Sequence, residues 1–197
     1  SRSAQRTFIS TKGAETMVPA SAWADFVQTM RPGDVLYIDG YLMDHPANRE
    51  AAEAALRVLP EGVLVILDVS PVIGIPDGLP TASLISMSTS EAASLWKDAD
   101  RKAINVRSWL PAEDAPIAMA ALLQHDVVVR VGKDGAYFTR YTDSAKLSST
   151  HIPPLSVEAI DTNGAGDAHT GALAASLAQG VPMGRALLLA NCAGALS

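Results

Sequence analysis

The chain has 197 residues, of which 48% are hydrophobic and 18% are charged, and its formal net charge is -6 at pH 7. This apolar content can build a sizeable core, so a disordered chain, a collagen-like chain and a disulfide-stapled miniprotein are excluded. The 15 Lys and Arg against 21 Asp and Glu, with only 5% aromatic residues, argue against a nucleic-acid partner. We expect a single domain over residues 1–197.

The sequence also indicates a compartment. Cys192 is the single cysteine, so no intrachain disulfide can form, and this composition fits a reducing cytoplasm. The most apolar stretches, 63–67 and 186–196, fall short of the roughly 18 residues that span a bilayer, so we expect no membrane partner. The first ten residues contain neither an initiator Met nor the apolar core of a signal peptide. We therefore expect a cytoplasmic protein whose sequence here begins in mid-protein.

Short apolar runs alternate with segments of helical spacing along most of the chain. The apolar runs predict buried strands at 35–39, 63–68, 84–87 and 127–131. The segments between them predict helices at 21–30, 46–59, 90–97 and 114–123. Strands that alternate with helices need crossover connections, which favours a parallel sheet covered on both faces. The fold class is therefore α/β, a doubly wound three-layer α/β/α sandwich.

The chain departs from this alternation after residue 131. Residues 136–139 follow the turn Lys133-Asp134-Gly135 and are typical of a hairpin return, which predicts an antiparallel addition to the sheet. Residues 153–160 are expected to form a loop or an edge strand. A helix is then predicted from Gly164 to Gln179, with Gly180 as its C-terminal cap.

The turn Gly164-Ala165-Gly166 at the start of that helix has the composition of an anion site. Its glycines let the backbone approach a ligand, and the free N–H groups of the first helical turn attract negative charge. The negative charge of Asp167 would repel a phosphate bound there, so its presence suggests a chemical task. One such task is to take the proton from an alcohol that receives a phosphoryl group. A structural role for Asp167, facing the helix dipole, stays open. Neither the GK[ST] phosphate loop nor the dinucleotide pattern G-x-G-x-x-G is present, which disfavours a dinucleotide-dependent oxidoreductase.

The segment DTNGAGDAHTGAL at 161–173 resembles the C-terminal pattern DTTGAGDxFxxG of the ribokinase-like, PfkB-type carbohydrate kinases. The turn at 129–135 is similar to the family's T-x-G-x-x-G turn, and 88–91 is similar to its N-x-x-E motif. This resemblance implies a ribokinase-like fold and an ATP- and Mg²⁺-dependent kinase that phosphorylates a hydroxyl of a sugar or sugar-like molecule. The family's N-terminal strands, small β lid and last strands have no counterpart in this chain. Because that lid often dimerises, a homodimer stays open.

The resemblance also implies roles for single residues. Asp167 would be the base that deprotonates the acceptor hydroxyl, and the N–H groups of Gly164, Ala165 and Gly166 would form the anion hole. Glu91 would organise Mg²⁺ and its waters. Asp161 resembles the residue around which many members bind a monovalent cation such as K⁺. The residues expected beside the nucleotide and the base are Arg130, Gly132, Gly135 and Asn191.

The chain departs from the family pattern at several of these positions. Ser88 replaces the motif Asn, Arg130 replaces the usual Thr, Asn163 replaces the second Thr, and His169 stands where Phe is common. These departures leave two alternatives: a hydroxymethylpyrimidine or pyridoxal type of vitamin kinase from the same superfamily, and a nucleotide-binding pseudokinase. The sequence does not name the substrate.

Three residues carry both a structural and a functional interpretation. Glu91 lies three residues after Ser88, which is also the spacing of a helix capping box. Asp68 is either an ordinary residue at a strand end or part of a turn that resembles the family's D-x-N-P-R turn. His169 could form an acid/base pair with Asp167. Residues two apart on a helix point in different directions, however, so we expect His169 to pack in the core.

Overall fold

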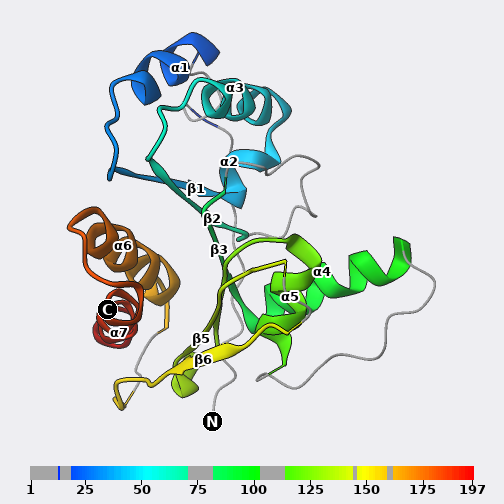
Figure 1. Ribbon diagram of the computed structural model, residues 1–197, viewed down its shortest axis with the longest axis vertical. Helices are drawn as coiled ribbons and strands as arrows, with labels where there is room; N and C mark the ends of the chain where they lie inside the picture. Colours follow the sequence, from blue (N-terminus) through cyan, green and yellow to red (C-terminus); the bar gives the residue numbers. More distant parts are fainter. Residues whose placement is uncertain (1–12, 14–18, 71–81, 103–113, 144–145, 159–161) are drawn as a thin grey trace.

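The computed structural model describes residues 13, 19–70, 82–102, 114–143, 146–158 and 162–197. These residues form a six-stranded sheet whose spatial order follows the chain, β1-β2-β3-β4-β5-β6 (Figure 1). The strands are β1 (Val35–Asp39), β2 (Leu64–Asp68), β3 (Leu84–Ser88), β4 (Val127–Arg130), β5 (Ala136–Thr139) and β6 (Ser149–Ile152). Strands β1 to β4 are parallel, and β5 and β6 are antiparallel to their neighbours.

Helices cover both faces of this sheet. They are α1 (Ala20–Gln28), α2 (Gly40–Asp44), α3 (Pro46–Arg57), α4 (Thr89–Lys102), α5 (Ala115–Leu123), α6 (Ala165–Ala178) and α7 (Met183–Leu196). Figure 1 shows α6 and α7 side by side on one face, away from α4 and α5 on the other.

Side-chain alternation along the strands explains the two helical layers. Val65 and Leu67 of β2 pack in a cluster with residues of α2 to α5, whereas Ile66 packs in a second cluster with residues of α6 and α7. A strand whose two faces are both covered must be apolar on both, as β2 is. The predicted three-layer α/β/α sandwich and its antiparallel addition are confirmed.

Two local features differ from the prediction. Helix α4 extends to Lys102 and not to residue 97, because the sequence after residue 97 has no Gly or Pro to end it. A short helix, α2, follows β1 directly and was not expected. Asp39 caps it, since one of its carboxylate oxygens accepts a hydrogen bond of 2.8 Å from the Leu42 N–H. Residues 153–158 form a loop, as one of the two expected options, while 159–160 lie outside the described residues.

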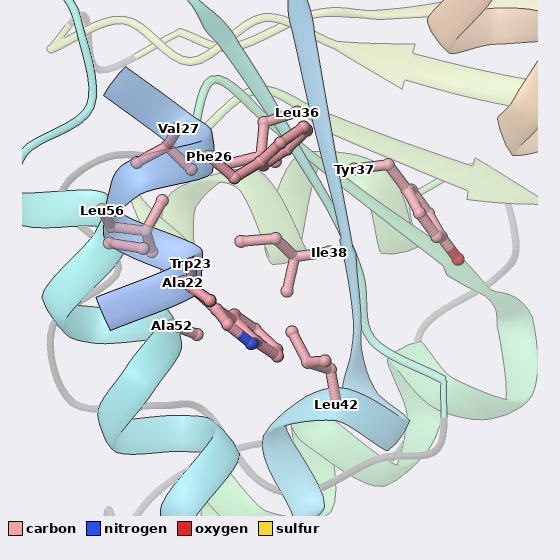
Figure 2. A pocket seen from close by; sticks show the side chains of 11 residues that line it. Ala22, Trp23, Phe26, Val27, Leu36, Tyr37, Ile38, Leu42, Ala52 and Leu56 are labelled. Carbon is pink, nitrogen blue, oxygen red and sulfur yellow. The ribbon is translucent and has the colours of Figure 1, made fainter. Parts of the chain in front are cut away.

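An apolar pocket of about 390 Å³ lies between α1, α3 and β1. Figure 2 shows the side chains of Trp23, Leu42 and Leu56 around it, whereas the Tyr37 ring points to the opposite side of β1 from Ile38. A lining of this kind offers almost nothing to hold a charged ligand. Charged chemistry is therefore expected elsewhere. In the described part of the chain, no helix is both long and apolar enough to cross a membrane.

Candidate functional site

The first turns of α6 lie against the carboxyl ends of the central strands. Arg130 ends β4, Asp68 ends β2, and both contact Thr170 in the second turn of α6. In open α/β sheets, ligands bind beyond the carboxyl ends of the strands. The helix predicted to carry the chemistry therefore begins at the edge of the sheet where ligands are expected.

The turn that opens α6 has the backbone of an anion site. Gly164 is the residue that precedes the helix, and its φ of +81° is in the left-handed region that favours glycine. Gly164 has no side chain with which to cap this end of α6, and the first N–H groups of a helix have no partner within it. Gly164 is exposed and Ala165 and Gly166 are partly exposed, which leaves the turn open to solvent. The anion-binding role of Gly164, Ala165 and Gly166 stays a prediction.

Asp167 is exposed in the first turn of α6. Its carboxylate is close enough to Tyr37 of β1 to act on that phenol. Burial raises the pKa of Tyr37 most, and the negative charges of Asp68, Asp39 and Asp167 raise it further. The phenol of Tyr37 is therefore influenced by the charge of Asp167 on α6 as well as by those of Asp68 and Asp39.

Arg130 forms the centre of a buried polar cluster. Its Nη1 donates to Asp68 Oδ2 at 2.5 Å, to Ser86 Oγ at 2.7 Å and to Thr170 Oγ1 at 2.9 Å. Its Nη2 donates to Asp68 Oδ1 at 3.3 Å and lies 3.6 Å from Glu91 Oε2. The Arg130 side chain is 14% exposed. The structure therefore places Arg130 in contact with protein groups from β2, β3, α4 and α6.

Glu91 forms the capping box that its spacing allows. Its Oε2 accepts a hydrogen bond of 2.6 Å from the Ser88 N–H, and its own N–H donates to Ser88 Oγ at 3.3 Å. The Glu91 side chain is 17% exposed and also pairs with Arg130, so it stays near the site. In the described ranges, no three His, Cys, Asp or Glu side chains gather as a metal cluster. Glu91 could hold Mg²⁺ through water, as a single hard carboxylate does.

The predicted glycine turn between β4 and β5 is a short 3₁₀ helix, Gly132–Asp134. Gly132 has φ +61° and Gly135 has φ +89°, both in the left-handed region. A Cβ at Gly132 would meet open space, whereas a Cβ at Gly135 would clash with the Ile152 carbonyl and lie 2.9 Å from the Pro154 nitrogen. Gly135 is therefore required by the chain that follows β6, whatever ligand Gly132 faces.

Asn191 is buried on α7 and links that helix to the end of β6. Its Nδ2 donates to the carbonyls of Ile152 at 3.1 Å and Pro153 at 2.9 Å. Asp161, the expected cation residue, lies outside the described residues. The roles proposed for both residues toward nucleotide and cation stay predictions.

His169 packs in the core, as expected, and is 5% exposed. Neither ring nitrogen has a hydrogen-bond partner among the described residues. Burial lowers the pKa of His169 to about 4, the positive charge of Arg130 lowers it as well, and Asn191 and Asp68 oppose this shift. The ring is therefore neutral at physiological pH.

Ser86 and Thr170 of the Arg130 cluster, and Tyr37, whose pKa responds to Asp167, were not among the predicted site residues. A signal existed for Ser86, because it is a polar residue in the buried run LISMS. A polar side chain in a strand that is covered on both faces needs a partner, and such a residue can be found from sequence. Nothing comparable distinguishes Thr170 within its helix.

The chain is similar in sequence to a family of known proteins. A family model described as pfkB family carbohydrate kinase matches residues 1–197. The uncharacterized sugar kinase YegV of Escherichia coli is 32% identical over 193 residues, which cover 95% of this chain and 55% of that protein. The bifunctional protein HldE of Rhodospirillum rubrum is 29% identical over 201 residues, which cover 90% of this chain and 39% of that protein. The chain therefore spans about half the length of these relatives, or less.

Solved structures show the same fold. Aminoimidazole riboside kinase from Salmonella enterica superposes with a TM-score of 0.70 at 24% identity, covering 97% of this chain and 64% of that one. Ribokinase from Thermotoga maritima gives 0.67 at 22% identity, with 87% and 51% covered. Fructokinase from Vibrio cholerae, solved with fructose, ADP and calcium, gives 0.64 at 22% identity, with 88% and 56% covered. The described fold is ribokinase-like and corresponds to part of each of those chains.

Proposed function

Since the chain belongs to the pfkB family of carbohydrate kinases, we propose that this protein transfers the γ-phosphoryl group of ATP to a hydroxyl of a sugar or sugar-like substrate. The observation that carries this proposal is the start of α6. There a glycine-led turn and the exposed Asp167 carboxylate lie side by side at the carboxyl ends of the strands. Phosphoryl transfer to an alcohol needs an anion site and a proton acceptor at this proximity.

The proposed mechanism assigns a task to each part of that turn. Asp167 accepts the proton of the acceptor hydroxyl as the oxygen attacks phosphorus. The N–H groups of Gly164, Ala165 and Gly166 donate to the oxygens on which negative charge is held during transfer. Gly132 and Gly135 form the turn against which the nucleotide lies. Burial of the neighbouring Arg130 cluster limits water on the protein side of the site.

The residues present fit a divalent cation with ATP. Mg²⁺, when bound, supplies positive charge that neutralises the phosphate oxygens. Glu91 is the described carboxylate that we assign to its waters, because it stays partly exposed beside the cluster. A monovalent cation such as K⁺ at Asp161 completes the proposal.

Supporting observations for the substrate class come from the relatives. They are named as kinases of ribose, fructose and aminoimidazole riboside, and one structure holds fructose with ADP. We therefore propose a small polyhydroxylated acceptor. A kinase assay across pentoses, hexoses, nucleosides and aldonic acids identifies it, and phosphorylation of a hydroxymethyl pyrimidine or pyridine alone would favour a vitamin kinase.

The decisive test is Asp167→Asn in the full-length protein. We expect kcat to fall by ~10² or more while the Kd for ATP stays within about twofold, because general-base loss acts on the chemical step. Asp25→Asn, an exposed helical aspartate of α1, is the matched control and should leave kcat unchanged. Turnover by Asp167→Asn at the wild-type rate would place the base elsewhere.

A pseudokinase is the second candidate. It is favoured by Arg130, which replaces the usual Thr and pairs with Glu91, the carboxylate assigned to the metal. Tight ATP binding by the wild-type protein without product from any acceptor in the panel would support this candidate.

A further inference from the structure

We propose that Arg130 is a positioning residue, which fastens the first turns of α6 to the strand ends and thereby holds Asp167 in place, and that it is not a ligand of the nucleotide phosphates. This inference rests on the proposed function, because it assumes that Asp167 is the base. It replaces the role that the family resemblance gives to position 130.

The hydrogen bonds of Arg130 carry the first step. Its η nitrogens face five protein oxygens: Asp68 Oδ1 and Oδ2, Ser86 Oγ, Thr170 Oγ1 and Glu91 Oε2. The N–H bonds of these nitrogens are therefore directed at protein acceptors. A phosphate that bound Nη1 would have to displace two hydroxyls and the Asp68 carboxylate, which would lose their partner.

The charges around Arg130 point the same way. Burial acts to lower its pKa, but the hydrogen bond and charge of Asp68, together with the charge of Glu91, raise the pKa above its ordinary value. Arg130 is therefore positive and faces two carboxylates. The three side chains together are negative by one charge, so the cluster does not attract a phosphate as an isolated arginine would.

Thr170 links Arg130 to α6. Thr170 is fully buried, and its hydroxyl accepts from Arg130 Nη1. The same hydroxyl lies 3.0 Å from Asp68 Oδ2 and 3.1 Å from the Gly166 carbonyl, and can donate to either. The guanidinium also lies against Gly166, 3.9 Å from the position that a Cβ would take there.

The consequence concerns Asp167 directly. Gly166 precedes Asp167 and Thr170 follows it by one helical turn, so the cluster holds the backbone on both sides of the base. The carboxylate of Asp167 itself is exposed, and its position depends on this backbone. A displacement of about 1 Å at a reacting group can cost on the order of 10²-fold in rate.

The test separates positioning from phosphate binding. In the full-length protein, we expect Arg130→Met and Thr170→Val each to lower kcat by ~10-fold or more, while the Kd for ATP changes by less than about twofold. Thr170→Ser keeps the hydroxyl and should restore kcat. Arg140→Met, which removes an exposed arginine at the opposite edge of the sheet, is the control and should change neither quantity.

Hydrogen exchange supplies a readout that does not need turnover. Arg130→Met and Thr170→Val should both speed exchange of the hydrogen-bonded backbone amides at 168–170 relative to those of α7. This measurement keeps the inference testable if no acceptor is found or if Asp167→Asn retains activity, either of which would count against the proposed function alone. If Arg130→Met does not fold, Thr170→Val, which keeps every charge, provides the result.

The contrary outcome is equally defined. If Arg130 binds phosphate, Arg130→Met raises the Kd for ATP by about tenfold or more, and Thr170→Val leaves kcat at the wild-type value. Unchanged exchange at 168–170 in both variants would also overturn the inference.

Discussion

An arginine is paired with an aspartate at the carboxyl ends of the parallel strands, and another such pair lies at their amino ends. The surroundings of the two pairs differ. At the carboxyl ends, Arg130 and Asp68 are 2.5 Å apart and their side chains are 14% and 5% exposed. At the opposite edge, Arg140 Nε lies 3.7 Å from Asp126 Oδ2, with 68% and 24% exposed. The Arg140–Asp126 ion pair links the residue before β4 to the residue after β5, whereas the Arg130 side chain reaches β3, α4 and α6.

The difference shows what makes a charged pair part of a site. A pair in water gains little, because solvent screens it and two long side chains must be ordered. A buried pair is costly to form and needs further hydrogen bonds, which Ser86 and Thr170 supply here. Convergence of elements that are distant in sequence, and not the presence of charge, separates the two edges.

The largest effect is expected for Asp68→Ala. Removal of this carboxylate leaves the Arg130 charge buried without its main partner, so the free energy of unfolding should fall by about 3–5 kcal/mol, as measured by denaturant titration. The double variant Asp68→Leu with Arg130→Met should recover much of this loss but not kcat, because the link to Thr170 is gone. A loss as large from Asp126→Ala would contradict the contrast between the edges.

The next effect concerns acid. His169 has a folded-state pKa of about 4 against an ordinary value of 6.5, so the unfolded chain binds more protons between these two pH values. The stability associated with the neutral ring is complete above pH 6.5 and is lost as the pH falls toward 4, by up to about 3 kcal/mol.

Denaturant titrations at several pH values measure this acid dependence. His169→Phe should flatten the curve between pH 6.5 and 4, because phenylalanine has no proton to bind. His125→Gln, at the opposite edge of the sheet, is the matched substitution of a histidine. A His169→Phe protein that is as acid-sensitive as the wild type would contradict the assignment.

A smaller effect is expected for Gly194→Ala on α7. A Cβ there would lie 2.8 Å from the Ala165 carbonyl oxygen and 3.3 Å from the His169 Cβ, so the start of α6 must move. The overpacking cost of about 1–3 kcal/mol exceeds the helix-propensity gain of roughly 1 kcal/mol. Gly171→Ala on α6 meets open space and should stabilise the protein instead. Thermal unfolding measures the change in stability of the two variants. Changes of the same sign would show that the close approach of α6 and α7 at Gly194 does not decide the effect.

The smallest effect is expected for Arg140→Met, at the edge without convergence. The free energy of unfolding should change by less than about 1 kcal/mol, and the change should shrink further when salt is raised. A change above 2 kcal/mol, measured by the same titration in low and high salt, would show that exposure of the pair does not decide its contribution.

Much of the framework could be predicted from the sequence, because apolar runs such as VLVIL and VVV fix which segments are buried strands. The start of α6 was also predictable from local sequence, because Gly164 and Gly166 lie within three residues of Asp167. The pairing of Arg130 with Asp68 was not predictable, because these residues are 62 apart and meet only once the order of the strands is known. The end of α4 was predicted five residues too early, because the polar segment after residue 97 has no Gly or Pro that would mark where the helix ends.

The agreement between strand order and chain order has a kinetic consequence. Each strand pairs with the strand that precedes it in the chain, so the sheet can form by successive closures, the longest of which is the pairing of Ile85 with Val127. The contacts of α6 are more distant in sequence: Thr170 meets Asp68 across 102 residues, and the same helix packs against β1. We expect this closure to come after the rate-limiting barrier, so that truncating Thr170 accelerates unfolding and hardly slows refolding in stopped-flow experiments. The end of the molecule that holds the proposed site would then be the last part to assemble and the first to open.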